Sequence, residues 1–105
     1  METAIREQGP NFPYTFDLAQ NFPNPFYTGT LISYTLDRAS EVEVDIYSLT
    51  GQRVVRLVGE FATAGAYEVV WDGLDDAGRN AASGAYLYRL RTGEVSQVRK
   101  LLLLR

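Results

Sequence analysis

The chain has 105 residues, of which 46% are hydrophobic and 22% charged, a balance that supports one globular domain with a sizeable core. A net charge of −3 with scattered arginines argues against a nucleic-acid-binding surface. The sequence contains no histidine and no cysteine, which excludes disulfides, thiolate catalysis, zinc–thiolate sites and the commonest general base.

The N-terminal residues lack hydrophobic periodicity. We interpret residues 1–13 as a linker or lead-in, followed by a single domain over residues 14–105. METAIREQGP has no apolar segment typical of a signal peptide, and no stretch has the length of a membrane span. If the module is exported, we expect its export signal to lie ahead of it in a larger parent protein.

Next in the chain comes a short predicted strand, TFDLA near Phe16, followed by NFPNPF over residues 21–26. Pro23 and Pro25 remove backbone donors, which argues against a helix or a central strand here. We expect this segment to be scaffold that crosses from one sheet to the other. Phe22 and Phe26 are expected to pin it to the edge of the core.

Alternating apolar residues then predict one strand after another: TLISYTL, EVEVDIYS, RVVRLV, AYEVVWD, AYLYRLR and a C-terminal strand. The side chains expected to face inward are Ile32, Tyr34, Leu36, Val42, Val44, Ile46, Tyr67, Val69, Trp71, Tyr86, Tyr88 and Leu90. Glycine-centred turns separate the strands, and Gly51 suits a left-handed position in a short hairpin loop. The pattern predicts an all-β, immunoglobulin-like antiparallel β-sandwich of about seven strands.

The connection from Asp72 to Gly84 is rich in oxygen ligands, with Asp75, Asp76 and Asn80 between them. Calcium is one interpretation, although the spacing of an EF-hand is absent. We favour turns in which the carboxylates cap local backbone amides, and we therefore predict no metal and no cofactor.

Acidic residues on the strands are the other candidates for chemistry. Glu43 and Asp45 are expected to share one solvent-facing strand surface, where nothing raises a carboxyl pKa. Serine and threonine have no histidine to activate them. The sequence therefore predicts that the module is not an enzyme.

Two tyrosines are expected to be exposed. Tyr27 lies just after NFPNPF, and Tyr47 lies on the outward face of its strand. Exposed aromatic rings can stack on sugars or anchor a protein partner, but they also form plain cross-strand pairs.

The C-terminus, VRKLLLLR over residues 98–105, puts apolar groups on both faces of one strand. Either the strand is covered on both faces within the fold, or one face is open to a partner. Arg99, Lys100 and Arg105 bracket the leucines with positive charge, which discourages nonspecific edge pairing. A homodimer through this strand is a further prediction.

Four segments in this order, FDLAQNFPNPF, IYSLTGQRV, WDGLDDAGRNAASGAYLYRL and RKLLLLR, resemble the successive motifs of the type A C-terminal sorting domains. These domains belong to the type IX (Por) secretion system. The pattern is also similar to the flagellar hook-capping immunoglobulin-like domain. The resemblance covers residues 14–105, and only the exit of the proline run, Tyr27-Thr28 in place of Asn-Pro, departs from the family pattern.

The resemblance implies a non-catalytic sorting signal at the end of a larger secreted protein. Its expected partners are an outer-membrane translocon, a sortase-like peptidase and a fused N-terminal cargo domain, and its expected location is the cell surface after transit through the periplasm. The implied signal residues are Gly84, Tyr86, Lys100, Leu101, Leu102, Leu103, Leu104 and Arg105. The implied structural motif residues are Pro23, Asn24, Pro25, Phe26, Gly51 and Trp71.

Two other functions stay open at this stage. One is an accessory carbohydrate-binding module of a secreted glycoside hydrolase, using Tyr27 or Tyr47. The other is a structural domain of the hook-cap kind.

Overall fold

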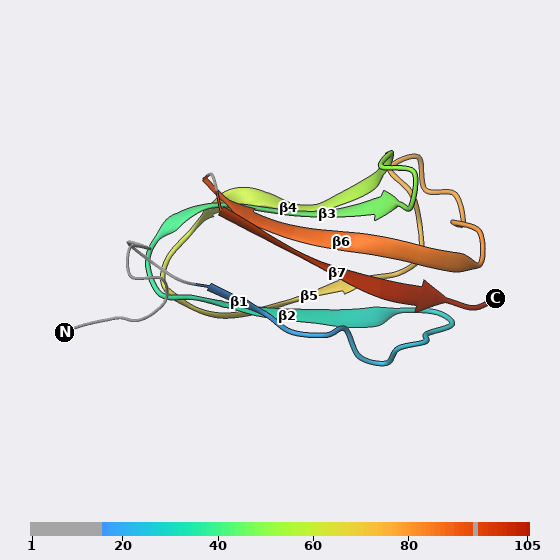
Figure 1. Ribbon diagram of the computed structural model, residues 1–105, viewed down its shortest axis with the longest axis horizontal. Coiled ribbons are helices and arrows are strands. Elements are labelled where there is room, and N and C mark those ends of the chain that lie inside the picture. The colour runs from blue at the N-terminus through green and yellow to red at the C-terminus, as the bar shows by residue number, and fades with distance from the viewer. Residues whose placement is uncertain (1–15, 94) are drawn as a thin grey trace.

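The computed structural model describes residues 16–93 and 95–105, which form two antiparallel β-sheets packed face to face (Figure 1). The seven strands are β1 (Phe16–Leu18), β2 (Thr30–Leu36), β3 (Ser40–Ser48), β4 (Arg53–Ala62), β5 (Gly65–Trp71), β6 (Gly84–Thr92) and β7 (Val95–Leu103). The predicted immunoglobulin-like β-sandwich is confirmed. The expected lead-in over residues 1–13 lies outside the described residues.

The strands divide three to four between the sheets. One sheet has the order β1-β2-β5, and the other has the order β4-β3-β6-β7. β7 is therefore an edge strand of the larger sheet, and β1 is an edge strand of the smaller one. Figure 1 shows these two strands running along the same open side of the sandwich.

The predicted inward faces form the core. All twelve predicted side chains are buried except Tyr67 and Val69, which are half-buried and pack against it. Trp71 is fully buried, with Phe26 tilted against it at 5.6 Å and the edge of Tyr86 at 5.4 Å between ring centroids. Because alternate residues of a strand point to opposite faces, period-2 patterning was sufficient to find this core.

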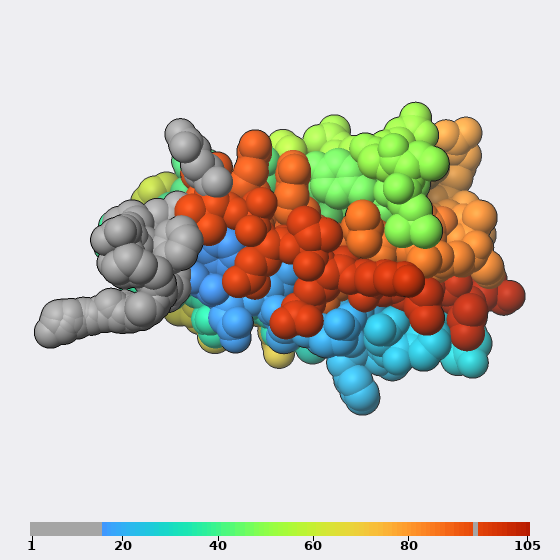
Figure 2. Space-filling model, viewed as in Figure 1, coloured from blue at the N-terminus to red at the C-terminus, as the bar shows by residue number. Residues whose placement is uncertain are grey.

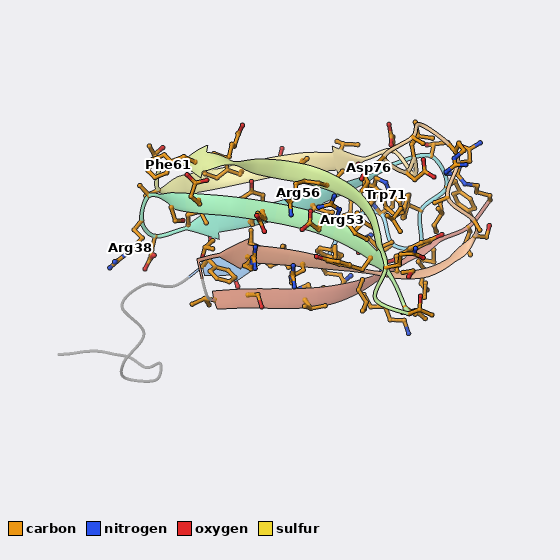
Figure 3. All side chains as sticks on the ribbon, turned by 90° about the horizontal axis from the view of Figure 1, so that it is seen from above. Arg38, Arg53, Arg56, Phe61, Trp71 and Asp76 are labelled. Atoms are coloured by element: carbon orange, nitrogen blue, oxygen red, sulfur yellow. The ribbon has the colours of Figure 1, made fainter. Side chains whose placement is uncertain are left out.

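The β3–β4 hairpin turns at Gly51, whose φ of 92° bears out the expected left-handed position. Further along the hairpin, the register shifts between Val44 and Asp45 and again between Ile46 and Tyr47. Each shift leaves an extra residue on β4, and such bulges bend and twist a strand. In Figure 3, which looks onto this larger sheet, Arg53 and Arg56 of β4 lie over its outer surface.

The proline-rich segment does not connect the two sheets, so that prediction was wrong, although Phe26 pairs with Leu103 at the edge of the other sheet. β1 and β2 pair antiparallel within one sheet, with Phe16 opposite Leu36. Phe26 is fully buried as expected, but Phe22 is 77% exposed, because its backbone pairs with Leu31 while its ring points outward. Among the described residues, no helix is long and apolar enough to span a membrane.

Candidate interaction site on the C-terminal strand

Strand β7 has one buried and one open face. Leu101 and Leu103 are fully buried in the core, whereas Leu102 and Leu104 are 36% and 41% exposed. The four leucines therefore alternate between the core and the outer face of an edge strand, and the outer two are partly exposed. Of the two arrangements that the sequence left open, the one with an open face is the one observed.

The N-terminal half of β7 is fastened to β1 across the open side of the sandwich. The backbone N–H of Leu18 donates to Gln97 Oε1 at 3.1 Å, and Arg99 Nε donates to the carbonyl oxygen of Leu18 at 2.6 Å. Figure 2 shows the atoms of the C-terminal strand lying directly against those of the β1 region. The inward side chains of β7 thus change from polar links at the start of the strand to buried leucines at its end.

The hydrogen-bonding edge at the end of β7 is covered by the proline-rich segment and the preceding Gln20. Phe26 N–H donates to the carbonyl of Leu102 at 3.0 Å, and Leu104 N–H donates to the carbonyl of Phe26 at 2.9 Å. Asn24 Oδ1 accepts from the N–H of Leu102 at 2.9 Å. Gln20 Nε2 donates to the carbonyl of Lys100 at 2.8 Å. The segment therefore pairs with the end of β7 like a short additional strand and covers backbone groups that would otherwise be unpaired.

Arg105 is held against the connection between β5 and β6. Its Nε donates to the carbonyl of Ala81 at 2.9 Å, its Nη2 donates to the carbonyl of Gly73 at 2.7 Å, and its backbone N–H donates to Ser83 Oγ at 2.8 Å. Gly73 has a φ of 81°, and a Cβ there would collide with the Arg105 guanidinium. The predicted signal residue Arg105 thus also fastens the end of the chain to the fold.

Gly84 and Tyr86, the other predicted signal residues, lie at the start of β6. Gly84 pairs with Leu103 and Tyr86 with Leu101, so both are next to the end of β7. Tyr86 is buried, and its hydroxyl donates to the carbonyl of Ala82, four residues upstream, at 2.6 Å. That arrangement matches the tyrosine corner of immunoglobulin-like sandwiches, which gives Tyr86 a structural role.

Lys100 is the only lysine of the chain and lies on the outer face of β7, opposite Leu87 of β6. It is exposed, and no ion pair joins it to residues 16–93 or 95–105. The structure therefore brings the predicted residues together at one end of the β6–β7 pair. Of their side chains, it presents Lys100, Leu102 and Leu104 outward.

The expectation that Asp45 faces solvent was wrong. Its carboxylate is buried under Arg56, whose Nε and Nη2 donate to it at 2.8 and 3.2 Å. The Tyr47 hydroxyl donates to the same carboxylate at 3.3 Å and accepts from Arg89 Nη2 at 2.6 Å. Glu43, by contrast, stays partly exposed and pairs with Arg91 at 2.5 Å.

This network also limits Tyr47 as a sugar platform. The Arg89 guanidinium lies 5.0 Å from the centre of the Tyr47 ring and covers that face. Tyr27 is 66% exposed, as predicted, and it follows Phe26, which pairs with the end of β7. Tyr47 is on β3, and β6 lies between β3 and β7 in the larger sheet. The two tyrosines therefore do not form one stacking surface.

In the Asp72–Gly84 connection, the carboxylates of Asp72 and Asp75 cap turns, as we preferred over calcium, whereas that of Asp76 lies 4.0 Å from Arg53 Nη2. Asp72 Oδ1 accepts from the N–H of Leu74, and Asp75 Oδ1 accepts from the N–H groups of Arg79 and Ala77. These hydrogen bonds, of which the one from the Arg79 N–H has the largest effect, lower the pKa of Asp75 below its ordinary value. Over the described residues, no three acidic side chains come together as a metal site.

Sequence reasoning missed Val98 and Leu87 as members of the outer face. Val98 is 52% exposed, two residues before Lys100, and lies opposite Arg89. The signal was present, because the alternation that buries Leu101 and Leu103 also assigns Val98 and Lys100 to the opposite face. What could not be read from the pattern was which sheet edge β7 occupies.

Comparisons with known proteins agree with this architecture. The FlgD Ig-like domain family matches residues 28–94. A search of curated proteins found no match. Among solved structures, dimeric latent PorU from Porphyromonas gingivalis is similar at 22% identity over 90% of this chain, with a TM-score of 0.72. PorZ of the same organism is similar at 20% identity over 89% of this chain, with a TM-score of 0.55.

A third similar structure is FlgD from P. aeruginosa, at 26% identity over 70% of this chain and 57% of that one, with a TM-score of 0.55. The chain spans only 10% of PorU and 12% of PorZ. The two Por proteins therefore share a fold with this chain over a small part of their own length, whereas the family match covers most of the sandwich. The chain belongs to the FlgD Ig-like domain family.

Proposed function

We propose that this domain is a non-catalytic sorting module that directs a larger protein, to which it is fused, through the type IX secretion system to the cell surface. The observation that carries the proposal is the outer face of β7, where partly exposed leucines lie beside Lys100, a lysine without an ion pair to residues 16–93 or 95–105. Exposed apolar strips of this kind mark interaction sites on small domains.

The similar structures support the proposal at the level of fold. PorZ is described as an essential bacterial surface component of the type IX secretion system, and PorU comes from the same organism. The motif resemblance over residues 14–105 points to the same system. The partners that follow are an outer-membrane translocon, a sortase-like peptidase and a fused N-terminal cargo domain, with a cell-surface location.

The test is a fusion of the full chain to the C-terminus of a fluorescent protein that carries a periplasmic export signal. It is expressed in a bacterium with a working type IX system and in a matched strain that lacks the translocon. Protease accessibility of the reporter on intact cells measures surface display. We expect display in the first strain and periplasmic retention in the second; retention in both contradicts the proposal.

The family match favours a second function, a structural domain of the hook-cap kind. This alternative predicts that the chain can replace the Ig-like domain of a flagellar FlgD. Swarming motility of a strain that carries the replacement measures this directly. Restored motility together with a retained reporter would favour the hook-cap function over sorting.

A further inference from the structure

We infer that the domain is recognised through a sheet face and not through a sheet edge, a conclusion that rests on the proposed sorting function. The docking surface, named here the outer β6–β7 surface, consists of Leu87, Val98, Lys100, Leu102 and Leu104. Its partner is a protein that presents an apolar patch bordered by carboxylates.

The members of this surface are neighbours by register. Leu87 lies opposite Lys100, and Val98, Lys100 and Leu102 follow one another on one face of β7. Alternate residues of a strand are spaced about 6.6 Å apart, so the strip from Val98 to Leu104 extends roughly 20 Å. Val98, Leu102 and Leu104 are each between 36% and 52% exposed. A strip of that length and exposure fits the apolar centre of a protein interface.

The charged residues of β6 and β7 are all positive. Strands β6 and β7 carry Arg89, Arg91, Arg99 and Lys100, and no aspartate or glutamate. Arg91 is neutralised by Glu43, Arg89 donates to Tyr47, and Arg99 donates to the backbone of β1. Lys100 has no ion pair with the other residues that the structure describes and so offers its charge to a partner, although the chain as a whole carries −3. Charge complementarity therefore calls for carboxylates on the partner.

The C-terminal half of the β7 edge, from the carbonyl of Lys100 to Leu104, is not available for strand addition. A partner strand there would need the outward N–H and C=O groups of Leu102, the N–H of Leu104 and the C=O of Lys100. All four are already paired with Gln20, Asn24 or Phe26. Recognition by β-augmentation would first have to remove this cover and break the pairing of buried Phe26. The open face needs no such rearrangement.

A membrane surface fits the outer β6–β7 surface less well than a protein does. Patches that bind anionic lipid usually contain about 4–8 lysines or arginines, whereas the outer β6–β7 surface contains one, Lys100. A second copy of the chain would place Lys100 of each copy against the same basic face, since a twofold interface pairs a patch with itself. A carboxylate-bordered protein avoids both difficulties.

The experiment uses the reporter fusion with four single substitutions. Val98→Gln and Lys100→Glu alter the outer β6–β7 surface. Val70→Gln is the matched control, because Val70 is 58% exposed on the outer face of β5 in the other sheet. Asn24→Ala removes one bond from the edge cover. The free energy of unfolding of each isolated variant is measured in urea, so that loss of fold is separated from loss of recognition.

We expect Lys100→Glu to lower surface display about tenfold and Val98→Gln to lower it severalfold, with display by the Val70→Gln and Asn24→Ala fusions unchanged. Equal display by all variants overturns the inference while leaving the sorting function intact. Increased display by Asn24→Ala alone means that the edge is recognised, which also overturns it. If the unaltered fusion is retained, the sorting function itself is wrong.

Two solution measurements test the other occupants. Sedimentation of the isolated chain reports self-association, and flotation with phosphatidylglycerol vesicles reports lipid binding. A dimer or a vesicle complex that Lys100→Glu abolishes would replace the protein partner by a second copy or by a membrane. A monomer that stays free of vesicles supports the protein partner.

Discussion

The leucine run at the end of β7 offers a sharp test of the structure, because neighbouring identical residues have opposite environments. Leu103 is fully buried, and Leu102 is 36% exposed. Leu103→Ala and Leu102→Ala remove the same atoms from adjacent positions, and they change the unfolded chain in nearly the same way. Any difference between them therefore reports burial in the folded state.

The expected magnitudes follow from that burial. Removing three buried carbons from Leu103 loses about 2–3 kcal/mol of transfer free energy, and the cavity left in the core raises the cost to about 3–4 kcal/mol. Leu102 leaves no enclosed cavity, so its truncation should cost about 1 kcal/mol. With a melting temperature that shifts by roughly 4–8 °C per kcal/mol in a domain of this size, the two variants are easily distinguished.

Urea unfolding followed by tryptophan fluorescence is a suitable assay, because Trp71 is the only tryptophan and is fully buried beside Phe26 and Tyr86. Leu101→Ala and Leu104→Ala form a second pair with the same contrast. Losses that agree within about 0.5 kcal/mol for Leu102→Ala and Leu103→Ala would refute the assigned register of β7.

Four further predictions concern the rest of the fold. Gly73→Ala should lower the free energy of unfolding in urea by about 1 kcal/mol more than Gly51→Ala does, since both glycines have positive φ but only Gly73 faces the Arg105 guanidinium. Equal losses would contradict that contact. Tyr88→Phe should cost about 1–3 kcal/mol, because its buried hydroxyl donates to one backbone group and accepts from another. Burial raises the pKa of Tyr88 above the ordinary 10.0, so this tyrosine ionises first in the unfolded chain, and the free energy of unfolding falls as pH rises above about 10. If the free energy of unfolding of Tyr88→Phe falls as steeply with pH as that of the unaltered chain, Tyr88 contributes nothing to the fall. Arg56→Met should destabilise the domain, because it leaves the buried Asp45 carboxylate without its cation, and adding Asp45→Asn should recover part of the lost stability. A melting temperature that Arg56→Met leaves unchanged would show that Asp45 is solvated.

Most of the secondary structure followed from local pattern. Alternation in TLISYTL, EVEVDIYS and AYLYRLR predicted the buried faces of β2, β3 and β6, because successive side chains of a strand necessarily point to opposite sides. Gly51 announced the β3–β4 turn, since few other residues adopt positive φ at low cost. These features depend only on residues that are close together in the chain, so they can be predicted from the sequence.

The two wrong predictions, for Asp45 and Phe22, concern environments that local pattern does not determine. Asp45 is buried because Arg56, eleven positions away, reaches over it from a bulged strand. Phe22 is exposed because the proline-rich segment returns to its own sheet and turns only Phe26 into the core. For Asp45 the alternation predicted the correct strand, whereas NFPNPF has no strand period; in both cases contacts made in the folded structure set the environment of the side chain.

The candidate site divides along the same line. The basic and apolar composition of residues 98–105 and the alternation along that strand were evident from sequence alone, and so was the need for one face to be either covered or open. Only the tertiary structure decided that β7 is an edge strand, that its outer face is open, and that Asn24 and Phe26 close its edge from about 78 positions away. The physical reason is that sheet order depends on long-range pairing, which leaves no periodic trace in the strands that it joins.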